Sequence, residues 1–367
     1  MPALGADAIV ARGLFILIPV WRHLVLSLEA IQQSLAAYLS KQWQTQVEVK
    51  TITQIFGGAS RDTYRLQVSS VQGERGLILR CDPPSSLIDT ERALEYGAYR
   101  AIYPTEIPVP EALYLEDDPI WLQRPFSIME EVPVGISATA DLNDAQRLNI
   151  GEQKWQILGR LAALDPVALG FDKLTDLPLP SNCASEQLEY WAQVIATDAL
   201  RPQPIAAAAI RWLRRNLPAP PEKLAIVHGD YRSGNFLFEP DGAITAILDW
   251  EMCHIGDPLE DLAWSLDPLW SWDQPALAGR LLPPNQAIAI WEKSSGMRVD
   301  RKQFIWWRIF AALKGVAIWI SSTENFQNGE SQAAILAMAG WMMTDRQNRI
   351  LLDYLSSHSS HKYGAEI

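Results

Sequence analysis

Three polar side chains at fixed spacings in the middle of this chain constrain its fold more than any other feature. Asp230 follows His228 and Gly229, Asn235 comes five residues after it, and Asp249 lies fourteen residues beyond Asn235. Phosphoryl transfer needs a carboxylate beside the attacking hydroxyl, and an amide and a second carboxylate that hold Mg²⁺. The spacing therefore predicts a phosphoryl-transfer site and the strand, loop and hairpin that assemble it.

The residues around this motif predict a buried strand followed by a hairpin. Residues 224–227 form a short apolar run that leads into the loop, and residues 236–238 and 243–248 have the composition of two strands. Asp241 and Gly242 supply the turn between them, because both residue types tolerate positive φ. The hairpin would place Asp249 beside Asn235, as a Mg²⁺ site requires. Alternatively, the acidic residues are ordinary turn or cap residues.

The run from Asp249 to Trp264, D-W-E-M-C-H-I-G-D-P-L-E-D-L-A-W, extends the pattern. Together with the loop it resembles the aminoglycoside phosphotransferase family, small-molecule kinases with a protein-kinase fold, and most of all the branch related to the kinase segment fused to acyl-CoA dehydrogenases. The resemblance implies an α+β, two-lobed protein-kinase-like fold, with an antiparallel-sheet N-lobe and a mostly helical C-lobe. It also implies a small-molecule hydroxyl acceptor, which is aminoglycoside-like, choline- or homoserine-like, or hydroxyacyl-CoA-like.

The same resemblance implies a role for each residue of the motif. Asp230 would be the catalytic base, and Asn235 and Asp249 would hold the metal. Three further residues would support the loop. The ring of His228 would bond nearby backbone, and Asp257 and Asp261 would brace the loop from a following helix.

The upstream half contains a candidate phosphate-covering turn. Gly57, Gly58 and Ser60 lie between the strand-like runs 47–55 and 64–68, where a kinase-type fold places a glycine-bearing turn over the phosphates. Two glycines between strands also suit an ordinary tight turn. No G-x-x-x-x-G-K-[ST] motif occurs, which excludes a P-loop NTPase as the source of any nucleotide activity.

A basic residue and a helical acid complete the template for a nucleotide site. Arg80 ends the strand-like run 77–80 at a position where many relatives carry lysine. A guanidinium binds phosphate or carboxylate bidentately. Its predicted partner is Glu95 on a helical segment, with Glu91 as the second choice and a surface charge as the alternative for either acid.

Residues 126–135, an apolar strand that ends in acid and is followed by proline and glycine, resemble the hinge between the two lobes. Main-chain groups near Glu130 and Val132 would contact the adenine of ATP, and GTP stays open as the nucleotide. A plain buried strand explains the same residues equally well.

The length of 367 residues exceeds the usual size of a single core, which favours two lobes. We predict an N-lobe over 24–131, a C-lobe over 132–367, and an extension of uncertain status over 1–23. The apolar run in that extension is short for a membrane span and is broken by Pro19, so stable membrane association is not expected. Apolar spacing predicts helices at 24–39, 142–164, 185–194, 205–217, 259–265, 285–293, 301–320 and 331–355.

Charge and cysteine usage narrow the partners and the compartment. The net charge of −12 argues against a nucleic-acid partner, although it also suits a cationic acceptor. The three cysteines form no C-x-x-C pair, which favours the reducing cytoplasm. The oligomeric state stays open.

Candidate acceptor residues follow the motif. Glu251 stands beside the metal carboxylate, and Trp270 and Trp272 could stack on an acceptor. A solvated hairpin residue and core packing are the alternatives. For the whole chain we expect an ATP- and Mg²⁺-dependent phosphotransferase. A catalytically silent nucleotide-binding module with the same fold is the second hypothesis, and Mg²⁺-dependent hydrolysis of a phosphate ester is the third.

Overall fold

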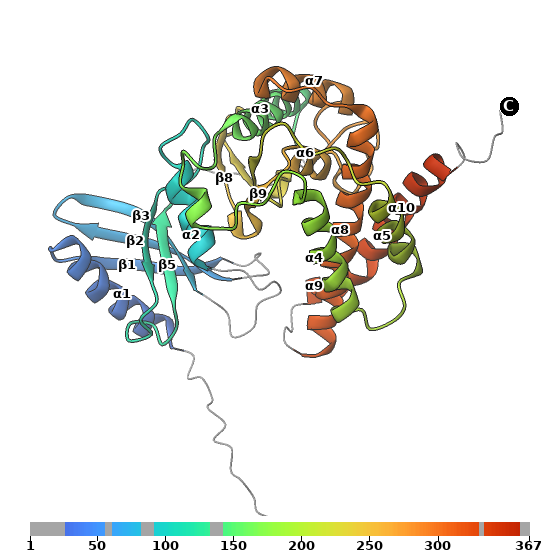
Figure 1. Ribbon diagram of the computed structural model, residues 1–367. Helices are drawn as coiled ribbons and strands as arrows, with labels where there is room; N and C mark the ends of the chain where they lie inside the picture. Colours follow the sequence, from blue (N-terminus) through green and yellow to red (C-terminus); the bar gives the residue numbers. More distant parts are fainter. Residues whose placement is uncertain (1–25, 56–60, 82–91, 133–141, 330–333, 360–367) are drawn as a thin grey trace, which may run out of the picture.

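The computed structural model describes residues 26–55, 61–81, 92–132, 142–329 and 334–359 and combines a sheet with a helical part (Figure 1). The sheet lies at the left of Figure 1, and the helices fill the centre and right. The predicted extension 1–23 and the candidate residues Gly57, Gly58, Ser60 and Glu91 lie outside the described residues.

The sheet is antiparallel throughout, with the strand order β1-β2-β3-β5-β4. Helix α1 covers it through Ile31, Leu35 and Leu39, which are buried, and the Ser27 hydroxyl accepts the Ala30 N–H at the start of that helix. β4 was not predicted from the sequence. The elements are α1 (Leu28–Trp43), β1 (Glu48–Ile55), β2 (Asp62–Ser70), β3 (Gly73–Cys81), α2 (Arg92–Ile102), β4 (Ala112–Glu116) and β5 (Phe126–Glu130).

The remaining helices build the larger part of the molecule. Most of their positions agree with the predicted segments to within four residues. The helix predicted at 301–320 continues to Gln327, and a π-helical segment at Ala339–Met343 interrupts the predicted helix 331–355. They are α3 (Asp144–Ala163), α4 (Cys183–Asp198), α5 (Pro204–Arg215), α6 (Leu259–Ser265), α7 (Pro284–Ser295), α8 (Arg301–Gln327), α9 (Ala334–Met338) and α10 (Thr344–Ser359).

Helix α8 runs through the middle of the helical part (Figure 1). In the described part of the chain it is the one helix whose length and apolar composition would suit a membrane span, but 78% of its apolar window is buried inside the protein. Its apolar character is therefore explained by packing in the core.

The buried apolar side chains form two clusters. The smaller cluster joins α1 to the sheet. The larger one fills the helical part and also includes Ala98, Tyr99 and Ile102 of α2. Helix α2 therefore packs against the core of the helical part, which is how its side chains reach the candidate site. The predicted lobe boundary after residue 131 stays a prediction.

Four short strands position the catalytic motif. β6 (Ala225–Val227) pairs with β9 (His254–Gly256), and β7 (Phe236–Phe238) pairs with β8 (Ile244–Ile247). Gly242 has φ +90° in the turn of the second pair, a conformation that side chains rarely adopt. The hairpin predicted from residues 236–248 is present, and the β6–β9 pairing is an addition that sequence spacing did not reveal.

Candidate active site

Asp230 lies in the loop between β6 and β7, where three donors hold its carboxylate. Oδ1 accepts the indole N–H of Trp264 at 2.8 Å, while Oδ2 accepts Arg232 Nε at 3.0 Å and Asn235 Nδ2 at 2.7 Å. An ionised carboxylate can accept about four hydrogen bonds. One acceptor position therefore remains on Oδ1, on a carboxylate whose orientation is already fixed.

The hairpin brings Asn235 and Asp249 together as predicted. Leu248 N–H donates to the Asn235 carbonyl at 2.8 Å, which joins the two strand ends. Both bonds of the Asn235 side chain use Nδ2, to the Asp230 carbonyl at 2.9 Å and to its carboxylate, so its Oδ1 has no partner among the described residues. Asp249 has φ +64°, in the left-handed region that few side chains tolerate, and its N–H donates to Tyr99 Oη at 3.0 Å. This backbone strain at a candidate ligand is typical of functional sites.

These two residues fit a magnesium ion. An amide oxygen without a protein partner and a carboxylate are the hard oxygen donors that Mg²⁺ takes, and it usually keeps several waters and phosphate oxygens besides. Burial opposes the charge of Asp249, but the guanidinium groups of Arg80 and Arg232 lower its pKa below the ordinary value. The carboxylate is therefore ionised at neutral pH. No larger cluster of three His, Cys, Asp or Glu side chains occurs in the described ranges.

Arg80 joins the sheet to the catalytic hairpin. Its Nη1 bonds Glu95 Oε1 of α2 at 2.6 Å, and its Nη2 bonds Asp249 Oδ1 at 3.1 Å. Arg61, the residue before β2, reaches the other oxygen of Glu95 through Nε at 3.1 Å, and all three of Arg61, Arg80 and Glu95 are buried. The predicted Arg80–Glu95 ion pair is thus present, and the contact to Asp249 was not foreseen.

The support of the loop differs in one respect from the prediction. Asp261 accepts the N–H groups of His228 and Gly229 at 2.6 and 3.0 Å, as a bracing residue should. Asp257 instead accepts the N–H of Leu259 at 2.8 Å at the start of α6, so it stabilises the helix that carries Asp261. Each acid has a pKa raised to about 6, in both cases chiefly by burial.

His228 is a neutral scaffold residue in this loop. Its Nδ1 accepts the Asp230 N–H at 3.1 Å, so the proton is on Nε2, which donates to the Leu248 carbonyl at 2.9 Å. Burial lowers the pKa of its ring to about 4. The ring therefore connects the catalytic loop to the strand end that carries Asp249, and it has no proton to donate to a substrate.

A network of buried charged side chains, not predicted from the sequence, supports the loop that carries Asp230. Lys314 of α8 donates to the Gly229 carbonyl at 2.7 Å and pairs with Glu260 at 3.0 Å, and His254 contacts the other oxygen of Glu260 at 3.1 Å. Burial alone would raise the pKa of Glu260, but Lys314 and His254 lower it to about 2. A lysine inside the apolar run of α8 was the available signal, because a buried ammonium requires a partner.

Lys154 and Arg232 were also missed. Lys154 of α3 is fully buried under the loop, with Nζ 3.2 Å from Ser233 Oγ and 4.9 Å from the centre of the Trp155 ring. Burial, with a smaller contribution from Arg232, lowers the pKa of this lysine to about 7. Arg232 stands two positions after Asp230, within the motif, and its contacts are described below.

The backbone amides of the predicted hinge differ in whether the sheet already uses them. The N–H groups of Glu130 and Glu131 are both bonded within the sheet, to the carbonyls of Glu111 and Gly76, and the Glu130 side chain pairs with Arg75. Val132 lies two residues after the end of β5. This leaves Val132 as the nearest amide after β5 that the sheet does not use.

Of the predicted acceptor residues, Trp270 is connected to Asp230 through Trp264. Its ring packs edge-on against Trp264 with centroids 5.2 Å apart, and its indole N–H donates to the Trp264 carbonyl at 2.9 Å. Trp272 is 46% exposed and lies under the guanidinium of Arg346. Glu251 is half-buried beside Trp250. Trp270 therefore packs against the residue that bonds Asp230, and Trp272 lies farther along the same segment.

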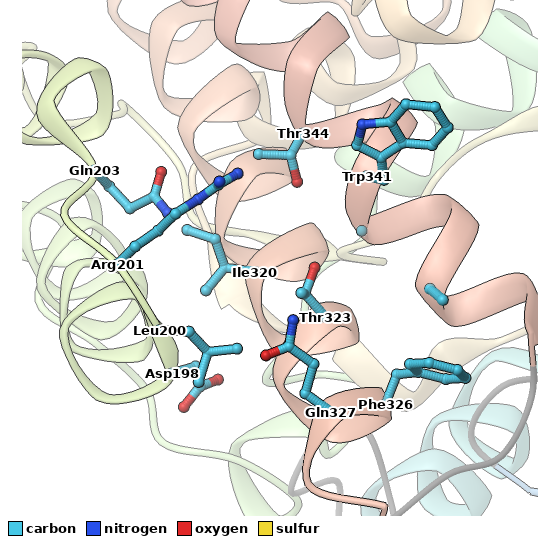
Figure 2. A pocket seen from close by; sticks show the side chains of 12 residues that line it. Asp198, Leu200, Arg201, Gln203, Ile320, Thr323, Phe326, Gln327, Trp341 and Thr344 are labelled. Carbon is cyan, nitrogen blue, oxygen red and sulfur yellow. The ribbon is translucent and has the colours of Figure 1, made fainter.

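A separate cavity of 510 Å³ lies between the end of α4, the start of α5, and the segment from α8 to α10 (Figure 2). Arg201, Ile320, Thr323 and Trp341 are among its lining residues, and none of the candidate site residues is. The pocket side chains Ile320 and Thr323 lie about 120° to 180° around α8 from Lys314 at 100° per residue, so the cavity is on a different face from the catalytic loop.

The sheet carries a buried Arg–Glu pair, and the helical part carries an Asp–Asn–Asp set on a loop and hairpin. This combination defines the class of kinase-like phosphotransferases. The comparisons agree. The chain belongs to the Phosphotransferase enzyme family, whose model matches residues 51–291.

Curated relatives show similarity over most of the chain. It is 28% identical over 305 residues to acyl-CoA dehydrogenase family member 11 of Rattus norvegicus, covering 78% of this chain and 38% of that protein. It is 27% identical over 253 residues to family member 10 of Mus musculus, covering 67% of this chain and 23% of that protein. The chain thus spans well under half the length of these relatives. They carry this kinase-like segment, as the sequence motif predicted.

Three solved structures establish the fold. A candidate aminoglycoside phosphotransferase from Ralstonia eutropha has a TM-score of 0.68 at 20% identity, with 89% of this chain and 98% of that chain covered. A choline/ethanolamine kinase family protein from Mesorhizobium loti has a TM-score of 0.57 at 15% identity, over 88% and 95%. A mutant of aminoglycoside phosphotransferase APH(4)-Ia, in a ternary complex with AMP-PNP and hygromycin B, has a TM-score of 0.55 at 17% identity, over 87% and 98%. The predicted α+β kinase-like fold is confirmed.

Proposed function

We propose that this protein transfers the γ-phosphoryl group of ATP to a hydroxyl group of a small molecule, with Asp230 as the catalytic base. The observation that carries the proposal is the carboxylate of Asp230, which three donors orient and which keeps one acceptor position on Oδ1. A hydroxyl bound there would be aligned for attack and would pass its proton to the carboxylate as the new bond forms.

Asn235 and Asp249 would hold Mg²⁺, which when bound neutralises phosphate charge. Arg80 would contact phosphate oxygens from the sheet side, with Glu95 fixing its side chain. Gly57, Gly58 and Ser60 would cover the phosphates, and main chain near Glu130 and Val132 would bind adenine. This division suits a reaction whose catalysis depends on positioning and charge stabilisation. Use of ATP also favours the cytoplasm.

For the acceptor, a hydroxyacyl-CoA is the first compound class to test. The support is the similarity to proteins named as acyl-CoA dehydrogenase family members. Choline-like, homoserine-like and aminoglycoside-like acceptors form the rest of the screen. Trp270 would border the acceptor because it packs beside the residue that holds Asp230 Oδ1, with Glu251 and Trp272 as more distant candidates.

One observation favours the second candidate, a silent nucleotide-binding module. Arg80 already bonds Asp249, so part of the metal carboxylate is engaged by a protein cation. Such a module would bind nucleotide without turnover.

Calorimetric titration with MgATP and MgGTP tests the proposal, followed by ADP release over the acceptor screen. We expect binding that weakens at least tenfold in Asp249→Ala, because the variant loses one of only two proposed metal ligands. Asp230→Asn should bind MgATP like the wild type and lose at least about 1,000-fold in turnover. Equal turnover by Asp230→Asn would remove that residue from the mechanism. Binding without turnover on any acceptor would favour the silent module.

A further inference from the structure

Arg232 extends over the catalytic loop beside Asp230 and has contacts on only part of its guanidinium. Nε donates to Asp230 Oδ2 at 3.0 Å, and the guanidinium lies over the Trp270 ring at 5.4 Å from its centre. Nη1 and Nη2 have no hydrogen-bond partner in the described ranges, and the side chain is 33% exposed. Up to four N–H donors are thus left at the edge of the candidate site.

The loop leaves room for this placement. A Cβ atom on Gly234 would lie 2.2 Å from Arg232 Nη1, so the guanidinium occupies the space that a side chain at position 234 would take. The residue on the other side of Gly234 is Asn235, a proposed metal ligand. The free end of Arg232 therefore lies along the stretch of loop that connects the catalytic base to the metal site.

The charges around Arg232 also indicate a position between Asp230 and the proposed metal site. Burial opposes its positive charge, but the carboxylates of Asp230 and Asp249 raise the pKa of the guanidinium above the ordinary value. It lies in the combined field of the proposed base and the proposed metal carboxylate. An attacking hydroxyl at the first and a nucleotide phosphate at the second would place the reacting phosphorus between them.

We propose that Arg232 binds the phosphoryl group during transfer, with Nη1 and Nη2 donating to its non-bridging oxygens while Nε stays on Asp230. The inference rests on the proposed function. In the step, the acceptor oxygen forms a bond to phosphorus as the bond to the β-phosphate oxygen breaks. The hydroxyl proton passes to Asp230, and the bonding electrons leave with ADP. The rigid fork of arginine fits phosphate oxygens bidentately, and stacking on Trp270 holds it in place.

Two other roles for Arg232 give different results in the same test. The residue could act only by orienting Asp230 through Nε, or it could bind an anionic acceptor. Because the acceptor is unidentified, the assay is slow transfer to water, measured as ADP released from MgATP. Affinity is measured separately with Mg·AMP-PNP.

Arg232→Ala and Arg232→Met should release ADP about 100-fold or more slowly than the wild type, with Mg·AMP-PNP affinity within about threefold. Added guanidinium chloride at millimolar concentration should restore part of the turnover of Arg232→Ala, because it can refill the space over Trp270. Arg232→Lys should be intermediate and serves if the smaller side chains unfold the protein. Arg214→Met removes an exposed arginine paired with Glu189 on α4 and should behave as wild type.

Sulfur substitution at the γ-phosphate separates contact from orientation. Wild-type turnover should slow with ATPγS, and this slowing should shrink in Arg232→Met because the contact to the substituted oxygens is already absent. A loss without guanidinium rescue and with an unchanged sulfur effect would overturn the proposal in favour of orienting Asp230. Turnover of Arg232→Met within about threefold of wild type would also overturn it. A wild type that binds no nucleotide and releases no ADP would instead contradict the proposed function.

Discussion

At the scale of single residues, Lys154 carries a free-energy cost in the folded state, because its charged form is buried. Its ammonium is fully buried under the loop that carries Asp230. Its neighbours are a hydroxyl and aromatic rings, and no carboxylate among the described residues is paired with it. An isolated buried charge is destabilising, so the group releases its proton more readily than a lysine in water. Its pKa is lowered to about 7.

This lowered pKa predicts a pH-dependent stability. Between pH 7 and about 10 the unfolded chain keeps the lysine proton while the folded chain has lost it, so the free energy of unfolding should rise with pH across that window. Lys154→Met should remove most of the rise and stabilise the protein at pH 7. Urea unfolding at several pH values measures it.

Lys293→Met is the control for this series, because Lys293 is exposed on α7 and should leave the slope unchanged. If Lys154→Met keeps the full rise in unfolding free energy, Lys154 is not the titrating group.

Residue-level prediction from the sequence succeeded where one motif fixed both identity and spacing. Asp230, Asn235 and Asp249 come together as their spacing indicated, because a strand, a loop and a tight hairpin leave little freedom over twenty residues. Arg232 stood in the same motif and was passed over, since its role depends on a stacking partner, Trp270, almost forty residues away.

At the scale of elements, α8 contributes both to the core and to the support of the candidate site. Its apolar length fills the helical part, and its Lys314 reaches the Gly229 carbonyl and the Glu260 carboxylate. One helix therefore supports the catalytic loop and the α6 helix that braces it.

Removing one partner of this buried pair should be strongly destabilising. Lys314→Met leaves the Glu260 charge buried with only His254 beside it, so we expect the free energy of unfolding to fall by about 3–5 kcal/mol. Chemical denaturation measures the loss, and ADP release should fall in parallel as the loop loses its support.

The double variant Lys314→Met with Glu260→Gln should regain part of that stability, since no uncompensated charge remains. Lys302→Met, which changes an exposed lysine in the first turn of α8, is the matched control. A drop as large in the control as in Lys314→Met would contradict the role of the buried pair.

Elements were predicted best where apolar spacing was regular. α6, β7 and the starts of α3, α5 and α8 fell within two residues of their predicted positions. The π-helical segment between α9 and α10 was missed because its composition matches that of an α-helix. β9 was missed because Ile255 is its one apolar residue, whereas β7 of the same length is apolar throughout.

At the scale of the whole molecule, Arg80 links the sheet directly to the hairpin that carries Asp249. It bonds Glu95 on α2 with one nitrogen and Asp249 with another. Tyr99, also on α2, reaches the Asp249 N–H. The position of the proposed metal carboxylate is therefore fixed from the sheet side as well as from the hairpin.

Arg80→Met should weaken binding of MgATP by about tenfold or more, because a buried cation at the phosphate site is lost and Glu95 keeps only Arg61. Arg80→Lys should lose less, since the charge remains but one side chain nitrogen replaces a fork that spans two carboxylates. Calorimetry measures both affinities.

Arg100→Met, an exposed arginine in the last turn of α2, is the control and should bind as wild type. Unchanged affinity in Arg80→Met would show that the arginine serves only to join the two parts of the fold.

By itself, the sequence indicated the candidate site residues through their spacing and most helices through apolar periodicity, both of which the chain carries locally. The kinase-like α+β class followed from the resemblance of its motifs to a known family. Tertiary structure decided which side chains support them. Lys314 under Gly229, Trp264 on Asp230 and Arg80 on Asp249 are contacts between segments distant in sequence. Only the packing of α2, α6 and α8 around one core sets their distances, because burial forces each polar group to find a partner within reach.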